Sequence, residues 1–442
     1  MIACHPRVVA GWLSACLGLV LVLPSARAEF DFERAPIFYR DAPANNAVAR
    51  LEEKLRSGEA QLVADERGSY LRSLLEALDI PVSSQTLVFS KTSLQQNRIA
   101  PEMPRAVYFN DDCYVAWVQG GLIELGVMDE HLGGMFYTLR DGGRTPALQR
   151  DRGGCIACHA SGRTQQVPGF FVRSVFPDAD GRPRGFGTVS DHRSPFEQRW
   201  GGWYVTGSHG QMRHLGNELA TDPDDDEKLD LERGANLLSL EDKFSTRRYL
   251  SPHSDLVALM VMEHQSQMHN YITLAHYETV QATASDQVMN EALGRPEEYR
   301  TDSTQRRIAK AGDQLVEYLL YCDEAPLHAE ISGTSTFAEE FAARGPFDSQ
   351  GRSLRQFDLR NRMFRYPCSY LIYSPAFDSL PEPVFQHVRT RLLAVLRGED
   401  QSERFKHLST ADRQAILEIL AETKPSLFAA DKTGHSPKLV DP

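Results

Sequence analysis

Five consecutive residues, Cys155-Ile156-Ala157-Cys158-His159, constrain this 442-residue chain more than any other feature of its sequence. Two thiols at this spacing can add to the two vinyl groups of one porphyrin, and the adjacent histidine is then carried beneath the iron as an axial ligand. The segment therefore has to fold so that three side chains reach one cofactor. We expect one haem to be attached covalently through Cys155 and Cys158, with His159 as the proximal iron ligand.

Other uses of two cysteines at this spacing fit the surrounding sequence less well. A thioredoxin-like redox pair follows a strand at the start of a helix in a βαβ unit, and no such pattern surrounds residues 155–158. A zinc site would need a second pair of cysteine or histidine ligands at regular spacing, which the sequence lacks. A disulfide between cysteines this close together is strained. Haem attachment is thus the chemistry that the motif favours.

The first 28 residues are predicted to be a cleaved export signal. Arg7 supplies a positive charge ahead of an apolar run over residues 8–23, and Ala26-Arg27-Ala28 has the small residues of a cleavage site. The run is shorter than the roughly 20 residues that a membrane-spanning helix needs, and no later segment is apolar for long enough. We therefore expect a periplasmic or secreted protein with no integral membrane span after signal removal.

The sequence has seven cysteines, and those of the mature protein would lie in that oxidising compartment. Two of them, Cys4 and Cys16, leave with the signal, and two belong to the motif. At most one disulfide can form among the other three, which are Cys113, Cys322 and Cys368. Cys322 with Cys368 is the simplest pair, although spacing alone leaves the pairing open.

The charge balance bears on possible partners. With 60 Asp and Glu against 48 Lys and Arg, the formal net charge is −12, and no basic stripe is visible. Such a chain is repelled by nucleic acid, which excludes that class of partner. A redox partner protein with a basic docking patch would be its natural complement.

The sequence predicts an α+β fold, with a β-rich middle region that carries the haem-attachment loop and a mainly helical C-terminal half. We divide the chain into the signal peptide (1–28), an N-terminal helix plus β-rich haem-binding region (29–220), an acidic linker (221–232) and a helical C-terminal region (233–442). Leucines at helical spacing predict helical structure from about residue 46 to about residue 80. The β-prone runs lie at 85–90, 107–109, 114–118, 122–127, 135–139, 170–176, 185–189 and 200–207. The runs from 107 to 139 predict a β-meander, and those on either side of a turn at 178–181 predict a hairpin. The later helices are predicted at 255–283, 304–321, 336–343, 383–396 and 410–423, the last with an N-cap region that begins at Ser409.

The motif resembles that of the c-type cytochromes, although the likeness covers little more than its five residues. The segments Asp191-His192-Arg193-Ser194-Pro195 and Trp200-Gly201-Gly202-Trp203-Tyr204 are similar to those of a family of large exported mono-haem bacterial proteins without assigned function. Dihaem peroxidases carry two C-x-x-C-H motifs, whereas this chain has one. The resemblance implies one haem c as the cofactor.

A second axial ligand would decide between electron transfer and chemistry at the iron. His209 is the first candidate, because it lies with Met212 and His214 in a segment dense in iron ligands. His264 is the second candidate, on the apolar face of the helix predicted at 255–283. His192 is a third, more simply explained as a turn residue. Arg173, Arg193 and Arg199 could pair with the haem propionates, because bidentate Arg–carboxylate contacts suit that task.

Two functions follow as expectations. The first is an exported c-type cytochrome that binds one covalent haem and transfers electrons. The alternative is a haem enzyme of peroxidase or oxygenase type, with an open or weakly ligated distal site. A haem-based sensor ranks last, because no output domain is visible. The sequence assigns no catalytic residue and does not identify the electron donor, the acceptor or a substrate.

Overall fold

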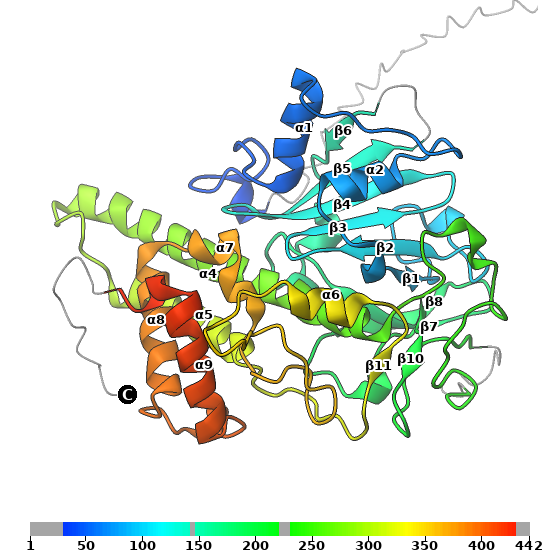
Figure 1. The fold of residues 1–442 in the computed structure, drawn as a ribbon. Coiled ribbons are helices and arrows are strands. Elements are labelled where there is room, and N and C mark those ends of the chain that lie inside the picture. The colour runs from blue at the N-terminus through cyan, green and yellow to red at the C-terminus, as the bar shows by residue number, and fades with distance from the viewer. Residues whose placement is uncertain (1–29, 142–145, 221–229, 430–442) are drawn as a thin grey trace, which may run out of the picture.

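A computed structural model describes residues 30–141, 146–220 and 230–429 (Figure 1). The predicted export signal and residues 221–229 of the predicted linker lie outside these ranges. The fold is α+β as expected, with an antiparallel sheet in the middle of the chain and most helices in the C-terminal half. Within the described ranges, no helix combines the length and the apolar character needed to cross a bilayer.

The sheet has seven antiparallel strands in the order β6-β5-β4-β3-β2-β1-β9. The predicted meander is confirmed, because the strands from β2 to β5 each pair with the next strand along the chain. Its first turn is held by Asn110, whose side-chain oxygen accepts from the backbone N–H of Cys113 at 2.8 Å. The strands are β1 (Thr86–Val88), β2 (Arg105–Phe109), β3 (Cys113–Trp117), β4 (Leu122–Asp129), β5 (Gly133–Arg140), β6 (Leu148–Arg150) and β9 (Trp203–Tyr204).

Different helices contact the two faces of this sheet. Asn46 caps helix α1 (Ala47–Ser57) and reaches Tyr137 on β5, whereas helix α4 (Leu256–Leu293) contacts Tyr114 on β3. Tyr114 stands in register with Phe136 through Gly126, so it lies on the opposite face from Tyr137. The sheet is therefore sandwiched between the N-terminal helices and α4 (Figure 1).

The helical segment predicted from residue 46 to residue 80 is wrong in one respect, because it is interrupted. Helix α1 ends at Gly58, which adopts a left-handed φ of +78°, and helix α2 (Leu71–Ala77) begins after a loop. A left-handed residue stops the backbone hydrogen-bond ladder, and glycine adopts that conformation without steric cost. The periodic leucines continue through the break, because the loop also contributes a buried leucine, Leu62.

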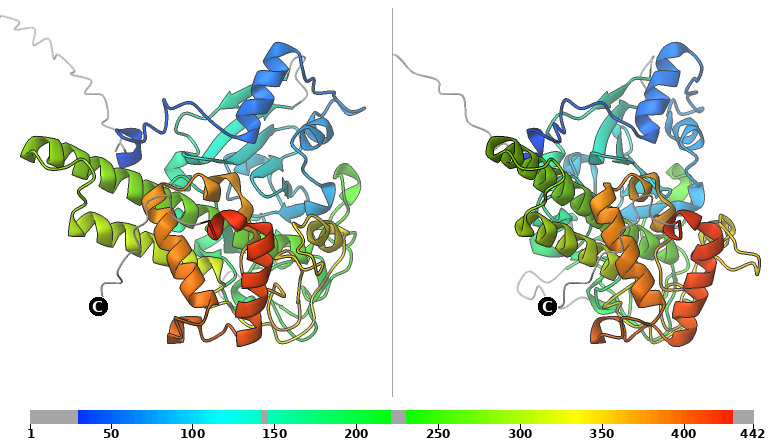
Figure 2. Two further views of the ribbon diagram at one scale, coloured as in Figure 1. Left: turned by 60° about the vertical axis from the view of Figure 1, so that its left-hand side comes forward. Right: turned by 90° about the vertical axis from the view of Figure 1, so that its left-hand side faces the viewer.

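The predicted C-terminal helices are confirmed. Helix α9 begins and ends at the predicted residues, and Ser409 and Asp412 form a capping box at its start. Helix α4 continues ten residues beyond the predicted end, to Leu293, and Figure 2 shows that its C-terminal end projects beyond the sheet. The helices after α4 are α5 (Asp302–Leu319), α6 (Phe337–Ala343), the short α7 (Pro375–Asp378), which was not predicted, α8 (Glu382–Leu396) and α9 (Thr410–Thr423).

Helix α4 is the centre of the molecule. Every residue from Leu256 to Thr273 is buried, so this stretch has no solvent-facing stripe. Its polar side chains therefore need partners inside the protein. Glu263, for example, accepts from Arg199 at 2.5 Å and from the indole nitrogen of Trp200 at 2.9 Å. That ion pair fastens the segment before β9 to the central helix.

Removing one partner of this ion pair should be costly. Glu263→Ala leaves the buried Arg199 guanidinium without a counter-charge, and we expect a loss of about 3–5 kcal/mol in the free energy of unfolding, measured by denaturant titration. The matched control is Glu330→Ala. Glu330 pairs with Arg360 at 3.2 Å, but both side chains are two-thirds exposed, so the loss should be about 1 kcal/mol or less. Equal losses in the two variants would contradict a structural role for the buried pair.

Candidate functional site

The motif lies in a loop, defined here as the motif loop (residues 151–171), between β6 and the hairpin of β7 (Val172–Pro177) and β8 (Pro183–Ser190). Its first turn is organised by Asp151, whose carboxylate accepts from the backbone N–H groups of Gly153 at 2.9 Å and Cys155 at 3.0 Å. A single helical turn, α3 (Ile156–His159), then carries the second cysteine and the histidine. The predicted hairpin around residues 178–181 is confirmed.

The imidazole of His159 is oriented by the backbone of the loop itself. Its Nδ1 lies 2.9 Å from the carbonyl oxygen of Gly169, and the Gly169 N–H donates to the His159 carbonyl at 2.8 Å. A carbonyl can only accept, so the ring proton is held on Nδ1 and the lone pair is held on Nε2. Within the described part of the chain, Nε2 has no hydrogen-bond partner. Burial lowers the pKa of His159 to about 4, so the ring is neutral at neutral pH.

Two phenylalanines enclose this ring. The centroid of the Phe136 ring, on β5, lies 4.6 Å from that of His159, and the centroid of the Phe171 ring lies 5.1 Å away. The guanidinium of Arg163 stands over Phe171, 5.9 Å from its centroid. The imidazole is thus fixed both by a hydrogen bond and by packing between aromatic rings.

The central helix holds the far end of the motif loop. The Asn270 side chain accepts from the backbone N–H of Phe170 at 2.9 Å and donates to its carbonyl at 2.7 Å. Gln267, one turn earlier, donates to the carbonyl of Arg163 at 3.1 Å. A Cβ on Gly169 would lie 1.9 Å from the Asn270 side-chain oxygen, so this position admits only glycine. Asn270 and Gly169 together therefore place the carbonyl that orients His159.

The two motif cysteines are unpaired and differ in exposure, since Cys155 is half-buried and Cys158 is exposed. Burial, reinforced by the charge of Asp151, raises the pKa of Cys155 to about 12. A thioredoxin-like nucleophile needs a lowered thiol pKa, so the raised pKa of Cys155 does not favour disulfide exchange by this thiol.

Metal binding by side chains alone is not favoured either. In the described ranges, no group of three His, Cys, Asp or Glu side chains comes together as the ligands of a metal ion would.

The suggested disulfide between Cys322 and Cys368 is wrong. Both thiols are free and buried, as is that of Cys113. The Cys322 sulfur lies 3.3 Å from the backbone carbonyl of Arg404, which satisfies its weak donor. Tertiary packing has turned this thiol toward another element.

The first predicted distal candidate lies away from the motif. His209 follows β10 (Gly207–Ser208), which pairs with β11 (Ser332–Gly333). The ring of His209 packs against Phe196 and His214, at 5.5 and 4.8 Å between centroids, and neither residue belongs to the motif loop. Both ring nitrogens of His209 are engaged, Nδ1 with the Met212 carbonyl at 2.8 Å and Nε2 with the Asn236 N–H at 2.9 Å.

The neighbours of His209 are also in use. The Met212 sulfur accepts from the His328 N–H at 3.4 Å, and Nδ1 of His214 accepts from the Gly216 N–H at 3.0 Å. The structure therefore does not bring any of these three predicted ligands next to His159.

His264, the second predicted distal candidate, is buried. This agrees with its predicted place on the apolar face of the helix. Nδ1 of His264 lies 2.8 Å from Nδ1 of His192, and its Nε2 lies 2.9 Å from the Ser369 hydroxyl. The His264 ring stacks on Tyr321 at 4.4 Å between centroids. The second and third candidates thus contact each other in the core, and burial lowers the pKa of both well below the usual range.

The three arginines proposed for the propionates have different surroundings. Arg193 pairs with Asp191 at 2.6 Å, and Arg199 pairs with the buried Glu263. Among the residues that the structure describes, the guanidinium of Arg173 donates to one backbone carbonyl, that of Phe186. The sequence reading missed Asp151, Gly169 and Asn270. Only the density of glycine around the motif hinted at such tight packing.

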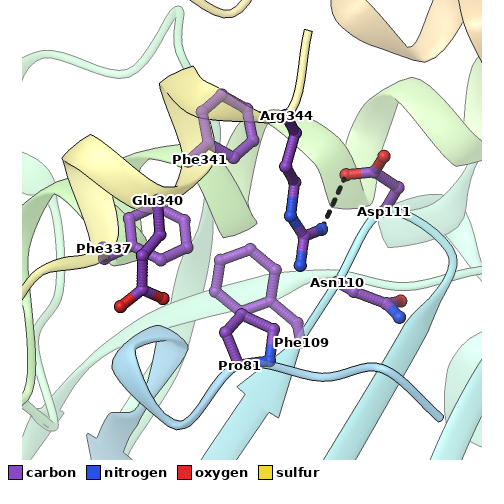
Figure 3. A pocket seen from close by; sticks show the side chains of 8 residues that line it. All are labelled: Pro81, Phe109, Asn110, Asp111, Phe337, Glu340, Phe341 and Arg344. Atoms are coloured by element: carbon purple, nitrogen blue, oxygen red, sulfur yellow. Dashed lines mark ion pairs between the residues drawn. The ribbon is translucent and has the colours of Figure 1, made fainter.

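Two pockets of the described residues lie away from the motif loop. One, a cavity of about 10 Å³, is lined by Phe109, Phe337 and Phe341, and Arg344 faces Asp111 beside it at 3.8 Å (Figure 3). The residues that line it include none of the predicted site residues. The candidate site is therefore the motif loop, and this pocket is a small gap beside α6.

Comparison with known proteins adds nothing to this geometry, since no family model, curated protein or solved structure matches the chain.

Buried neutral histidines should make the protein sensitive to acid. Burial lowers the pKa of eight histidines and raises the pKa of two carboxyls, Asp112 and Glu324, to about 7; the histidines are His159, His192, His209, His214, His264, His269, His276 and His407. Below about pH 6, unfolding lets the histidines take up protons and makes the two carboxyls release protons. The result is a net proton uptake, because the histidines outnumber the carboxyls. Stability therefore falls as the pH falls, by about 1.4 kcal/mol per pH unit for each net proton.

Urea unfolding of haem-free protein at pH 7, 6 and 5 measures this slope. The transition midpoint should move to lower urea at each step. A stability that stayed constant or rose across this range would contradict the neutral, buried state of these histidines.

Proposed function

We propose that this chain is an exported c-type cytochrome that carries one covalent haem and transfers electrons. Cys155 and Cys158 would attach the haem, and His159 would be its proximal iron ligand. The observation that carries the proposal is the state of His159: its ring is neutral, its proton is held on Nδ1 by the Gly169 carbonyl, and no residue that the structure describes bonds its Nε2. An axial ligand needs this arrangement before it meets the iron.

The residues of the motif loop fit a haem in two further respects. Both thiols are unpaired, and the exposed Cys158 is accessible for attachment. The single helical turn α3 is held at its start by Asp151, which accepts from the backbone N–H of Cys155. It is held at its end by the two hydrogen bonds between His159 and Gly169. Haem, when bound, supplies one-electron redox chemistry. The residues of this chain hold it, orient its ligand and exclude water from one side of that ligand.

Export and charge support the same proposal. The signal-like sequence of residues 1–28 would send the chain to the periplasm or beyond, where haem c is matured. The acidic net charge of −12 would favour a redox partner with a basic docking patch. Membership of the family of large exported mono-haem proteins, which rests on the likeness of the segments 191–195 and 200–204, is part of this proposal.

A second candidate function is haem-dependent chemistry on a small molecule such as peroxide or oxygen. One observation favours it: both ring nitrogens of His209 and both of His264 already have hydrogen-bond partners. Recruiting either ring as a distal ligand would break a bond inside the protein. An iron without a second strong protein ligand is open to exogenous ligands.

Covalent attachment is tested by removing the thiols. Protein matured in a periplasm with haem-attachment machinery should keep its haem after denaturation, whereas Cys155→Ala/Cys158→Ala protein should show none on a haem-stained denaturing gel. Cys322→Ala/Cys368→Ala is the matched control, because it removes two buried thiols from another part of the fold, and it should retain haem. Wild-type protein without haem would overturn the proposal.

The visible spectrum of the reduced protein separates the two candidate functions. Two strong axial ligands give a low-spin spectrum that carbon monoxide does not change, which is the outcome expected for an electron carrier. An open iron gives a high-spin spectrum that shifts when carbon monoxide is added. The second result would reject electron transfer as the sole function and favour the haem enzyme.

A further inference from the structure

Two arginines lie beside the motif, Arg163 on the motif loop and Arg173 on β7. Neither has an acidic partner within the residues that the structure describes. Both are only partly exposed, so solvent does not fully replace the missing counter-charge.

Their geometry places both arginines on the His159 side of the motif loop. The guanidinium of Arg163 stands over the ring of Phe171, and that ring packs against His159. Arg173 comes two residues after Phe171, where the chain is extended into β7. The side chains of Phe171 and Arg173 therefore leave the backbone in the same direction. Phe171 thus lies between the Arg163 guanidinium and the imidazole of His159.

The electrostatics agree with this placement. Burial lowers the pKa of Arg173, and the positive charge of Arg163 lowers it further, while Cys158 raises it. Two like charges that are partly desolvated and close enough to interact are unfavourable unless an anion joins them. Arg173 is held in position by the Phe186 carbonyl, to which its Nε donates at 3.1 Å. Its remaining N–H groups are free to bind a carboxylate.

We infer that Arg163 and Arg173 bind the two propionate carboxylates of the haem attached at Cys155 and Cys158. This inference rests on the proposed function and adds the residues that hold the acidic edge of the cofactor. A haem would bring two carboxylates to the motif loop beside these two side chains, and the planar guanidinium matches a carboxylate with two parallel hydrogen bonds. Arg193 and Arg199 are excluded from this role, because each already has a carboxylate partner.

The test measures the reduction potential of holo-protein as a function of pH for Arg163→Gln and Arg173→Gln. A positive charge beside the propionates stabilises their ionised form and also favours the reduced iron. Each variant should therefore keep its covalent haem, have a lower reduction potential, and show the pH-dependent break in potential at a higher pH than wild type. The double variant should shift further than either single variant.

Arg182→Gln is the matched control. Arg182 belongs to the turn of the same hairpin, but it is exposed and pairs with Asp180 at 2.7 Å. Its removal should leave both the potential and the position of the break where they are in wild type. Arg163→Lys and Arg173→Lys keep the positive charge but lose the planar guanidinium. They should therefore shift the pH of the break in potential less than the glutamine variants do. If a glutamine variant does not accumulate as folded protein, the lysine variants are compared with wild type instead.

The outcomes distinguish this inference from the function on which it rests. Wild-type protein without covalent haem would overturn the proposed function and the inference together. Holo-protein whose potential and pH break are the same in the Arg163, Arg173 and Arg182 variants would overturn the inference alone. A change in the reduction potential without any change in the pH at which the potential breaks would also overturn the inference. A purely structural disturbance gives that result, because it does not alter the ionisation of the propionates.

Discussion

The burial of helix α4 is the constraint on which the rest of this structure depends. From Leu256 to Thr273 every residue is inside the protein, and a buried polar group without a partner costs free energy comparable to a lost hydrogen bond. Each polar side chain on this stretch therefore fixes another segment against the helix. The pairs are Glu263 with Arg199 and Trp200, His264 with His192 and Ser369, Gln265 with Asn110 and Tyr370, Gln267 with Arg163, and Asn270 with Phe170.

One of these pairs reaches the motif loop and explains why its histidine is so well positioned. Asn270 holds both backbone groups of Phe170, and the carbonyl just before it, that of Gly169, accepts from His159. The imidazole is consequently linked to the central helix through one residue of backbone. Its orientation is set by the rigid part of the protein, which is how ligands are pre-organised for a metal.

The histidine pattern of the sequence illustrates a limit of reading ligands from composition. Residues 208–214 contain two histidines and a methionine, yet their polar atoms are used to close a local turn. Nδ1 of His209 meets the Met212 carbonyl three residues on, and Gly210 between them takes a φ of +57°. His264 was expected on a buried face and lies there, but its ring nitrogens serve the core. Hydrogen bonds therefore account for both ring nitrogens of His209 and for Nδ1 of His214 in this segment, while Nε2 of His214 is buried without a partner among the described residues.

Features that depend on neighbouring residues could be predicted from the amino-acid sequence. Short β-prone runs and turn residues located the meander, and the cap at Ser409 located the start of helix α9, because both signals act within a few positions. The chemistry expected of Cys155, Cys158 and His159 also follows from spacing alone. Contacts between segments that are distant in the chain are set by the tertiary structure. The Asn270 side chain bonds the backbone of Phe170, a hundred residues away in the chain. The Cys322 sulfur contacts the Arg404 carbonyl and not Cys368. A loop follows Gly58 although leucines continue at helical spacing. These outcomes depend on the packing of distant segments around a buried helix, and no periodicity within a short window contains that information.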